Sequence, residues 1–350
     1  MLFQQYLNNL DNAIRAGGNF RSAIFDDVAN IVGTPTRDQL LIEFLPKLMI
    51  AINLETGRTG GAKDAGQASA RGRAIAEIAN FLETGGASVF SNIDKNAFAF
   101  QLALRVRSPR IINQGQTTLC GPVAMVYDIA KRDPERYVRF AIALLTTGTG
   151  QLGVAQITAS TTIRNGYQRF LPEADYVVLA SIRDSDAVIL SLEPLRNVLT
   201  LTKPGALCEF MRQAGFTDVQ DHSFLELSTP LRILNAVTKF GLHGSGHNSF
   251  DQGANNLQAA QTDLNVRGRF VVMNADAAVA GAFLNGWSDR LGVRPDPLPA
   301  AETHWTAVRK LRITGNTVRM KIVTWGGSYE GSIAKDALLS RYAGFISAQP

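Results

Sequence analysis

The segment Asn113–Pro122, with the sequence NQGQTTLCGP, decides how the rest of the chain is interpreted. Gln114 lies six residues before Cys120, and Pro122 falls in the first turn of a helix that we expect to begin at the cysteine. A helix N-terminus presents unpaired backbone N–H groups and a partial positive charge, which favour a thiolate over a thiol. The N–H of Cys120 and the side-chain amide of Gln114 can donate to one carbonyl oxygen, as acyl transfer requires. The segment therefore predicts a nucleophilic cysteine that forms a thioester with its substrate.

This pattern, a Gln-Gly pair followed after four residues by Cys-Gly, resembles the active-site signature of papain-like cysteine peptidases, a clan that includes the C39-like peptidases. A second similarity lies downstream, where His304 and Trp305 precede an apolar strand and Trp325 is followed by glycine. The resemblance implies that Gln114 helps to hold the oxyanion. It also implies that His304 takes the proton of Cys120 and later protonates the leaving amine. It implies substrate contacts for a further group of residues, which are Gly121, Trp305 and Trp325.

The residue that orients the histidine departs from the family pattern. Papain-like peptidases carry an asparagine two positions before the Trp-Gly pair, and this chain has Val323 there. Thr324, Ser328 or a backbone carbonyl can hold the imidazole instead, or the site works as a dyad; of these we favour Thr324. Trp325 either shields the imidazole from water or is a core aromatic residue at the end of a hairpin.

The resemblance implies a thiol protease, that is, a hydrolase that cleaves protein substrates. It further implies a bacterial effector or toxin of interbacterial competition that acts inside a target cell, with a cognate inhibitor or immunity protein as a partner. Because C39-like enzymes favour double-glycine sites, Gly60-Gly61 is a candidate for self-cleavage. Two alternatives remain open: deamidation or transglutamination of a protein glutamine by the same residues, and a catalytically inactive module that keeps the fold for binding.

Composition indicates a globular protein of roughly two domains, because the chain has 350 residues, of which 45% are hydrophobic and 19% charged. The net charge of +5 comes from scattered basic residues, so we expect no nucleic-acid binding. Two cysteines indicate a reducing compartment, with Cys208 a buried apolar residue. The sequence shows no basic region before an apolar core at its start and no apolar run of membrane-spanning length. We therefore expect no membrane contact and a cytoplasmic location in the producing cell, with delivery by a specialised secretion system.

The expected organisation is an α+β papain-like fold, in which a helical lobe carries the cysteine and an antiparallel sheet lobe carries the histidine. A helical N-terminal region would occupy residues 1–86, with a glycine-rich linker at 55–73, and the peptidase domain residues 87–350. Within that domain, residue patterns predict the following elements: helices at 120–131, 133–145, 171–189, 204–215 and 334–343, a helix that begins after Gly253, a strand at 270–273, and a hairpin at 312–325 that turns at Gly315-Asn316.

Two further motifs are rejected as functional sites. His243 and His247 have the spacing of two zinc ligands on a helix, but the glycines between them favour a loop, so we expect no metal. Residues 57–63 resemble a phosphate-binding loop, yet no strand precedes them and Asp64 stands where a serine or threonine would bind magnesium. We therefore expect no cofactor.

Overall fold

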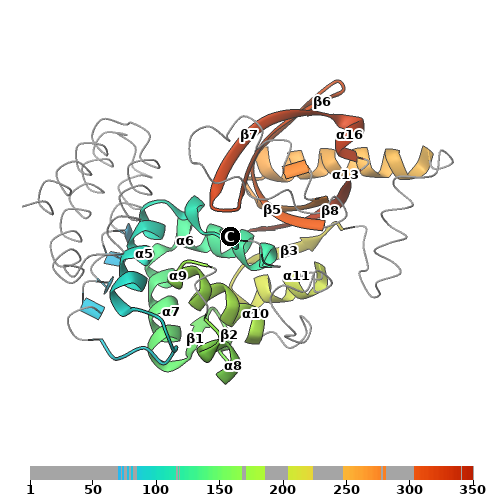
Figure 1. Cartoon of the computed structure of the whole chain (residues 1–350). Helices are drawn as coiled ribbons and strands as arrows, with labels where there is room; N and C mark the ends of the chain where they lie inside the picture. Colours follow the sequence, from blue (N-terminus) through green and yellow to red (C-terminus); the bar gives the residue numbers. More distant parts are fainter. Residues whose placement is uncertain are drawn as a thin grey trace, which may run out of the picture. The chain divides into compact units, whose positions relative to one another are not determined.

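The computed structural model describes most of the chain between residues 85 and 349. The described residues are 70–71, 73–74, 77–78, 80–81, 85–115, 117, 119–167, 171–185, 204–223, 247–276, 279–280, 303–339 and 341–349. The chain divides into two compact units, and Figure 1 labels their elements. One unit consists of residues 1–109, 129–150 and 160–178, and the other of residues 110–128, 151–159 and 179–350. Most of the predicted N-terminal region, its linker and Gly60-Gly61 lie outside the described residues.

The described part of the first unit is helical. Its principal helices are α5 (Lys95–Arg107), α7 (Pro134–Thr147), α8 (Thr161–Asn165) and α9 (Glu173–Asp175). The ends of α7 follow from local chemistry, because Asp133 accepts a hydrogen bond from the N–H of Arg136 at 3.1 Å and Gly148 adopts a left-handed conformation with φ 75°. The helix predicted from Asp133 to Leu145 is thus confirmed.

The second unit is built on a six-stranded antiparallel sheet with the order β3-β8-β4-β5-β6-β7. The strands are β3 (Thr217–Asp221), β4 (Phe270–Asp276), β5 (Thr303–Thr314), β6 (Thr317–Thr324), β7 (Gly327–Ala334) and β8 (Tyr342–Gln349). The smaller elements that contribute to this unit are α10 (Ser181–Ser185), α11 (Pro204–Gln213), α16 (Lys335–Leu339) and a two-stranded sheet of β1 (Thr149–Leu152) and β2 (Ala155–Thr158). The fold is therefore a mixed α+β fold.

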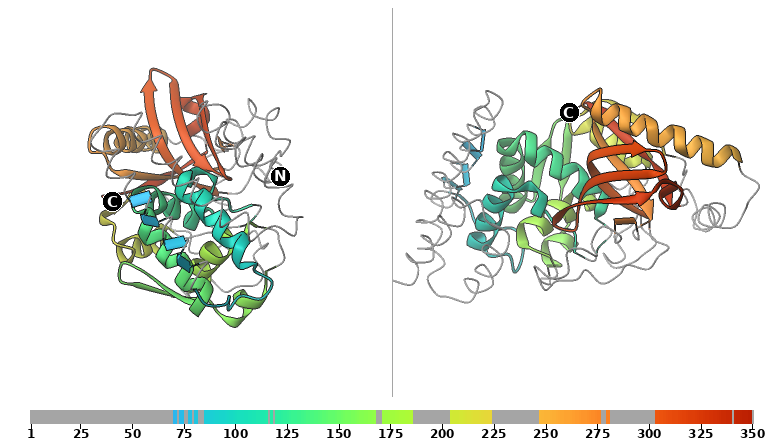
Figure 2. Two further views of the ribbon diagram at one scale, coloured as in Figure 1. Left: turned by 90° about the vertical axis from the view of Figure 1, so that its left-hand side faces the viewer. Right: turned by 90° about the horizontal axis from the view of Figure 1, so that it is seen from above.

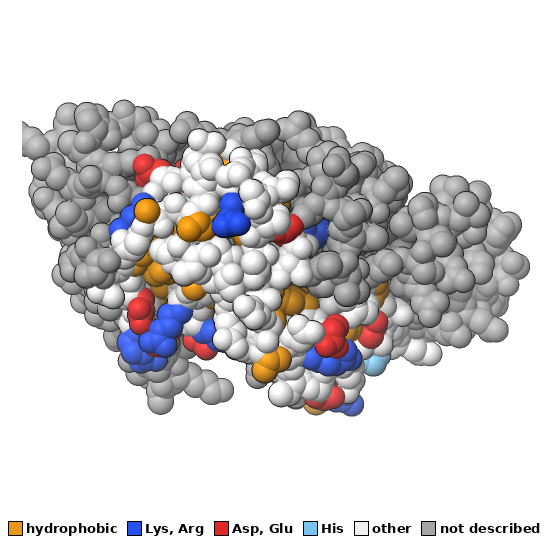
Figure 3. Space-filling view, turned by 90° about the horizontal axis from the view of Figure 1, so that it is seen from below, with side chains coloured by type: hydrophobic (Ala, Val, Ile, Leu, Met, Phe, Trp, Pro, Cys, Tyr) orange, Lys and Arg blue, Asp and Glu red, His pale blue; other side chains and the backbone are white. Residues whose placement is uncertain are grey.

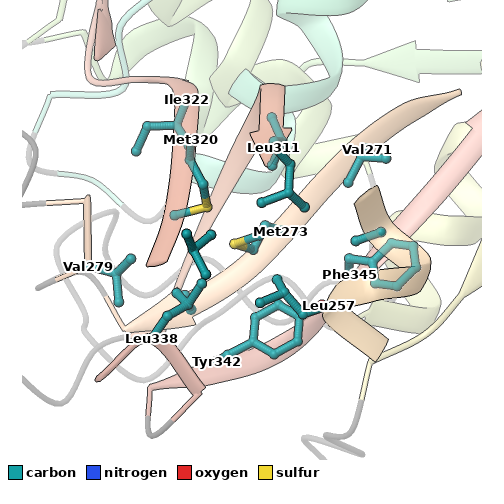
Figure 4. Packing of buried hydrophobic residues seen from close by; sticks show 14 of the residues in the cluster. Leu257, Val271, Met273, Val279, Leu311, Met320, Ile322, Leu338, Tyr342 and Phe345 are labelled. Carbon is teal, nitrogen blue, oxygen red and sulfur yellow. The ribbon is translucent and has the colours of Figure 1, made fainter. Parts of the chain in front are cut away.

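Helix α13 (His247–Asn265) covers one face of the large sheet, as Figures 1 and 2 both show. Figure 4 shows the hydrophobic cluster between them, in which Leu257 of the helix packs near Met273, Met320 and Phe345 of the strands. Burial of these apolar side chains stabilises the layer by roughly 1.5–3 kcal/mol for each one that leaves water.

The opposite face of the sheet is also buried, with Trp305, Ala307 and Val323 each at most 3% exposed. Helix α6 (Cys120–Arg132) contacts β5, where the guanidinium carbon of Arg309 lies 5.9 Å from the centre of the Tyr127 ring. The backbone N–H of Trp305 also reaches the sulfur of Cys120, the first residue of α6. The start of α6 is thereby held close to the start of β5.

Most elements predicted within residues 87–350 are confirmed, namely α6, α11, β4 and the β5–β6 hairpin, whose turn has Gly315 at φ 56°. Two predictions were wrong. The final segment forms only the short helix α16 and then strand β8, because residues 342–349 pair with β3 and β4 in the sheet interior. Gly253 lies within α13 rather than ahead of a helix. The helix expected over 171–189 is present from Glu173 to Ser185, where a π-helical turn (Tyr176–Ala180) joins α9 to α10, and its last four residues lie outside the described residues.

Among the described residues, no helix has both the length and the apolar character needed to cross a bilayer. On the face of the molecule in Figure 3, acidic and basic side chains lie next to one another and hydrophobic side chains are scattered. Arg212 and Glu209 form one such surface pair at 3.4 Å, and both side chains are more than half exposed. Exposed pairs of this kind contribute little to stability.

Candidate active site

The cysteine loop, residues 113–119, folds back on itself at Gln114. Thr117 donates its backbone N–H to the carbonyl oxygen of Gln114 at 3.3 Å and its hydroxyl to the same oxygen at 2.6 Å. Asn113 closes the turn by accepting the N–H of Gly115 at 2.9 Å, and Gly115 has φ 57°. This turn explains why a glycine follows the glutamine, since other residues rarely adopt that backbone conformation.

The Gln114 side chain is buried beside this turn and only loosely bonded. Its Nε2 donates to the carbonyl oxygen of Thr117 at 3.4 Å, which is long for a hydrogen bond, and its exposed fraction is 1%. Its Oε1 has no hydrogen-bond partner among the described residues. The amide is therefore not locked in its present orientation by strong bonds.

Cys120 is the first residue of α6, and its sulfur faces backbone N–H groups. The N–H groups of Trp305, Gly121 and Cys120 itself lie close enough to favour the thiolate, as does the charge of Arg183. Burial outweighs them, because a charged sulfur loses its hydration there, and the pKa of the Cys120 thiol is raised. The thiolate expected from the helix N-terminus is thus wrong for this state of the protein, in which Cys120 is a neutral thiol.

His304 lies near the start of β5 and is held on two sides. Its Nε2 and the Oγ1 of Thr324 are 2.6 Å apart, within hydrogen-bonding distance. The ring of Trp325 stacks on the imidazole, with the ring centres 4.3 Å apart and the planes at 11°. Burial lowers the pKa of the His304 imidazole to about 3, so the ring is neutral at physiological pH.

Thr324, the alternative favoured from the sequence, is the residue whose hydroxyl contacts the imidazole. Its position at the end of strand β6 explains this contact. Thr324 is the last residue of β6, and Trp325 follows it with φ 42°. Trp325 both stacks on the imidazole and packs against the hydrophobic cluster under α13, so its two predicted roles are compatible.

The cysteine and histidine parts of the site meet through the backbone. The N–H of Trp305, the residue after His304, reaches the sulfur of Cys120. Asn113 lies against Gly326, since a Cβ atom placed on Gly326 would be 3.2 Å from its side chain. A hydrogen bond between the sulfur and the imidazole is not among the contacts of the described residues. The structure thus brings the neighbours of Cys120 and His304 together, while each side chain keeps other partners.

A small apolar cavity adjoins the histidine on the α13 side of the sheet. His304 and Thr306 supply its polar wall, and the remaining lining residues are Met273, Ala275, Val279, Ala280, Met320 and Ile322. His304 and Thr306 share this face because they are two residues apart on β5. Trp305 points the other way and is 2% exposed, so its backbone rather than its indole is what the sulfur contacts.

Two buried polar residues near the site were not found from the sequence. Asn274 of β4 is directly opposite Trp305 and has no exposed surface. A signal existed for it, because an asparagine interrupts an otherwise apolar strand, FVVMNAD. Arg183 of α10 is 3% exposed and acts on Cys120, and nothing in its sequence context pointed to that.

No group of three His, Cys, Asp or Glu side chains suited to a metal ion occurs in the part of the chain that the structure describes. His243 lies outside that part, and the backbone of His247 begins α13. Cys208 is buried in α11, as expected, and its pKa is raised to about 12 by burial and then by Asp221. Comparison with family models, with curated proteins and with solved structures finds no match to this chain.

Proposed function

We propose that this protein is a papain-like cysteine peptidase that uses Cys120 as nucleophile and His304 as base. The observation that carries the proposal is the pair of contacts that fixes the His304 imidazole. Thr324 engages Nε2 and Trp325 covers one face of the ring, which leaves Nδ1 as the nitrogen that can accept a proton. Cys120 meanwhile lies at a helix N-terminus whose contacts reach the residue next to this histidine.

In the proposed reaction, Nδ1 of His304 takes the proton of the Cys120 thiol, and the sulfur attacks the carbonyl carbon of the scissile bond. The carbonyl oxygen becomes an oxyanion that accepts the N–H of Cys120 and the side-chain N–H of Gln114. Gln114 can turn to this oxygen because its present bond to Thr117 is long.

Collapse of the tetrahedral intermediate breaks the C–N bond, and the imidazolium of His304 gives its proton to the leaving amine. The acyl group stays on the Cys120 sulfur as a thioester. A water molecule that loses its proton to His304 then attacks the thioester, releases the acid product and restores the thiol.

The closed state of the site disfavours the first proton transfer. Burial raises the pKa of the Cys120 thiol and lowers that of His304 to about 3, so the neutral pair is the stable form. Water or a polar substrate that enters the site removes part of the desolvation that causes both shifts. The proposal therefore includes an opening step on substrate binding that brings the sulfur and the imidazole together.

The test is covalent labelling by a peptide vinyl sulfone at neutral pH, followed by intact mass and peptide mapping. We expect labelling at Cys120, loss of labelling in His304→Ala, and none at Cys208, which is an internal control because it is buried and its pKa is raised to about 12. Equal labelling of Cys120 in the wild type and in His304→Ala would reject the proposed base.

Thr324 offers a matched pair of variants for the same measurement. Thr324→Val removes the hydroxyl at nearly constant shape, and we expect labelling to slow about tenfold, which corresponds to one lost hydrogen bond of about 1–1.5 kcal/mol. Thr324→Ser keeps the hydroxyl and should stay within about threefold of the wild type. If both variants behave alike, the contact between Thr324 and His304 has no part in the reaction.

A catalytically inactive binding module is the second candidate, favoured by the neutral thiol and the low imidazole pKa of the closed state. Failure of every vinyl sulfone to label Cys120 in the folded protein would establish it. Termini-selective proteomics of cells that express wild type or Cys120→Ala then separates hydrolysis, which makes new termini, from deamidation, which changes glutamine mass alone. The same comparison tests action as a bacterial toxin on a protein of the target cell.

A further inference from the structure

Asn274 is a buried asparagine whose amide is unsatisfied. Its exposed fraction is 0%, and neither its Oδ1 nor its Nδ2 has a hydrogen-bond partner among the described residues. A buried polar atom without a partner lowers the stability of the folded protein by about 1–3 kcal/mol, and this amide has two such atoms. Such a group requires an explanation in the function of the protein or in a bound molecule.

The strand register places this amide beside the candidate active site. Asn274 of β4 pairs with Trp305 of β5, so the two side chains lie on the same face of the sheet. The backbone N–H of Trp305 is directed to the Cys120 sulfur and therefore away from β4. Asn274 and Trp305 are thus a pair of opposite residues that do not exchange backbone hydrogen bonds, and in such pairs the side chains are closest. On its other side Asn274 pairs with Gly344, which contributes no side chain.

The unsatisfied atoms restrict what can bind there. Asn274 offers one acceptor and one donor about as far apart as those of any carboxamide, so a second carboxamide can satisfy both at once. A hydroxyl group must use a single oxygen for both bonds. An ammonium group lacks an acceptor and a carboxylate lacks a donor, and burial of either charge is costly.

We infer that Asn274 determines the specificity of the Cys120 site by binding a substrate side chain that ends in a carboxamide, that of glutamine or asparagine. This inference rests on the proposed thiol chemistry. Cys120 and Asn274 are each at most 3% exposed and both adjoin Trp305, so an opening of the site at Trp305 would expose both to the substrate.

The first experiment uses two pairs of alanine-based tripeptide vinyl sulfones. Within each pair, one probe has glutamine and the other methionine, at the first or the second residue from the reactive group. Methionine matches glutamine in length but cannot bond the amide. In the wild type, we expect the glutamine probe of one pair to label Cys120 at least about tenfold faster than the methionine probe of the same pair. The methionine side chain cannot form the two buried hydrogen bonds to Asn274.

The matched variant is Asn274→Leu, which keeps the size of the side chain and removes its polar atoms. We expect the preference for glutamine to disappear or reverse, while the methionine probe labels within about threefold of its wild-type rate. Rates within twofold for both wild-type pairs, or a glutamine preference that survives in Asn274→Leu, would overturn the inference but leave the peptidase proposal standing. Absence of all labelling in the folded protein would overturn both.

Stability provides a readout that does not depend on labelling. Asn274→Leu should raise the melting temperature, because it removes an unsatisfied buried amide. The control is Asn256→Leu on α13, where the amide is satisfied: it accepts from Tyr342 at 2.6 Å and donates to the carbonyl oxygen of His222 at 2.8 Å. That variant should lower the melting temperature. An equal loss of stability in both variants would mean that Asn274 already has its partners in the free protein, which contradicts the inference.

Discussion

Burial acts on Cys120 and His304 in opposite directions because the two groups are charged in opposite protonation states. A thiol becomes charged when it loses a proton, so burial raises its pKa; an imidazole becomes charged when it gains one, so burial lowers its pKa to about 3. The backbone N–H groups around the sulfur oppose the first effect without overcoming it. The free protein therefore keeps the Cys120 thiol protonated and the His304 imidazole neutral.

The pH dependence of folding measures the burial of His304. The imidazole has a pKa of about 3 in the folded protein and an ordinary value of 6.5 when unfolded, so between these values only the unfolded chain takes up the proton. The free energy of unfolding should fall as the pH decreases through this window, by up to about 1.4 kcal/mol per pH unit from this residue. Denaturant titrations of wild type and His304→Gln between pH 7 and pH 4 give the difference, in which the other titrating groups cancel. Parallel curves for the two proteins would contradict the burial.

At the scale of single residues, the sequence predicted the residues of the candidate site but not their environment. Cys120, Gln114 and His304 were found from motifs, and Thr324 from its place beside the missing asparagine. The raised pKa of the thiol was missed because a motif specifies the helix N-terminus but not how much solvent reaches it. Asn274 and Arg183 were missed because they come from other elements of the fold: Asn274 is opposite Trp305 on β4, and the charge of Arg183 on α10 acts on Cys120.

The turn between β6 and β7 is the element that joins the two halves of the site. Trp325 and Gly326 both have positive φ, at 42° and 66°, and they follow Thr324 directly. This turn places the indole on the His304 ring and brings the backbone at Gly326 against Asn113 at the head of the cysteine loop. One sharp turn thus positions both the His304 ring, the proposed base, and the loop that carries Gln114, the proposed oxyanion donor.

Substitution of Gly326 by alanine tests that contact, with Gly315→Ala as its control. Both glycines have similar positive φ, at 66° and 56°, but a Cβ on Gly315 meets open space whereas one on Gly326 lies 3.2 Å from Asn113. Each variant should lose about 1–2 kcal/mol for the left-handed backbone. Only Gly326→Ala should also slow vinyl sulfone labelling of Cys120, because the cysteine loop must move. Equal labelling rates in the two variants would show that the loop does not depend on this turn.

Elements with strong local signals were predictable, and those decided by sheet pairing were not. The β5–β6 hairpin follows from alternating residues and a glycine turn, and α7 from Asp133 and Pro134. The last strand was not predicted, and the helix predicted over 334–343 is helical only at α16 (Lys335–Leu339). Residues 342–349 form β8 since β3 and β4 bond to both of its edges. Pairing with strands that are distant in the sequence therefore decides this segment, and no local pattern specifies it.

At the scale of the whole molecule, the chain passes several times between its two compact units. The first unit contains an ion pair with almost no exposed surface. Arg105 of α5 donates through Nε and Nη2 to the two carboxylate oxygens of Asp175, each at 2.6 Å. A bidentate pair of this kind fixes geometry, but its net contribution to stability is small because both charges are desolvated.

Removing one partner of this ion pair should therefore lower the free energy of unfolding more than replacing both partners with apolar residues. Arg105→Met removes the bidentate partner of the buried Asp175 carboxylate, and we expect a loss of about 3–5 kcal/mol in the free energy of unfolding. The double variant Arg105→Met with Asp175→Leu removes both charges and should recover most of that loss. Denaturant titration at pH 7 measures both. Labelling of Cys120, which belongs to the other unit, should change less than about twofold in either variant at temperatures well below the transition. A double variant as unstable as the single one would mean that the pair itself, rather than the penalty of an unpaired carboxylate, stabilises the first unit.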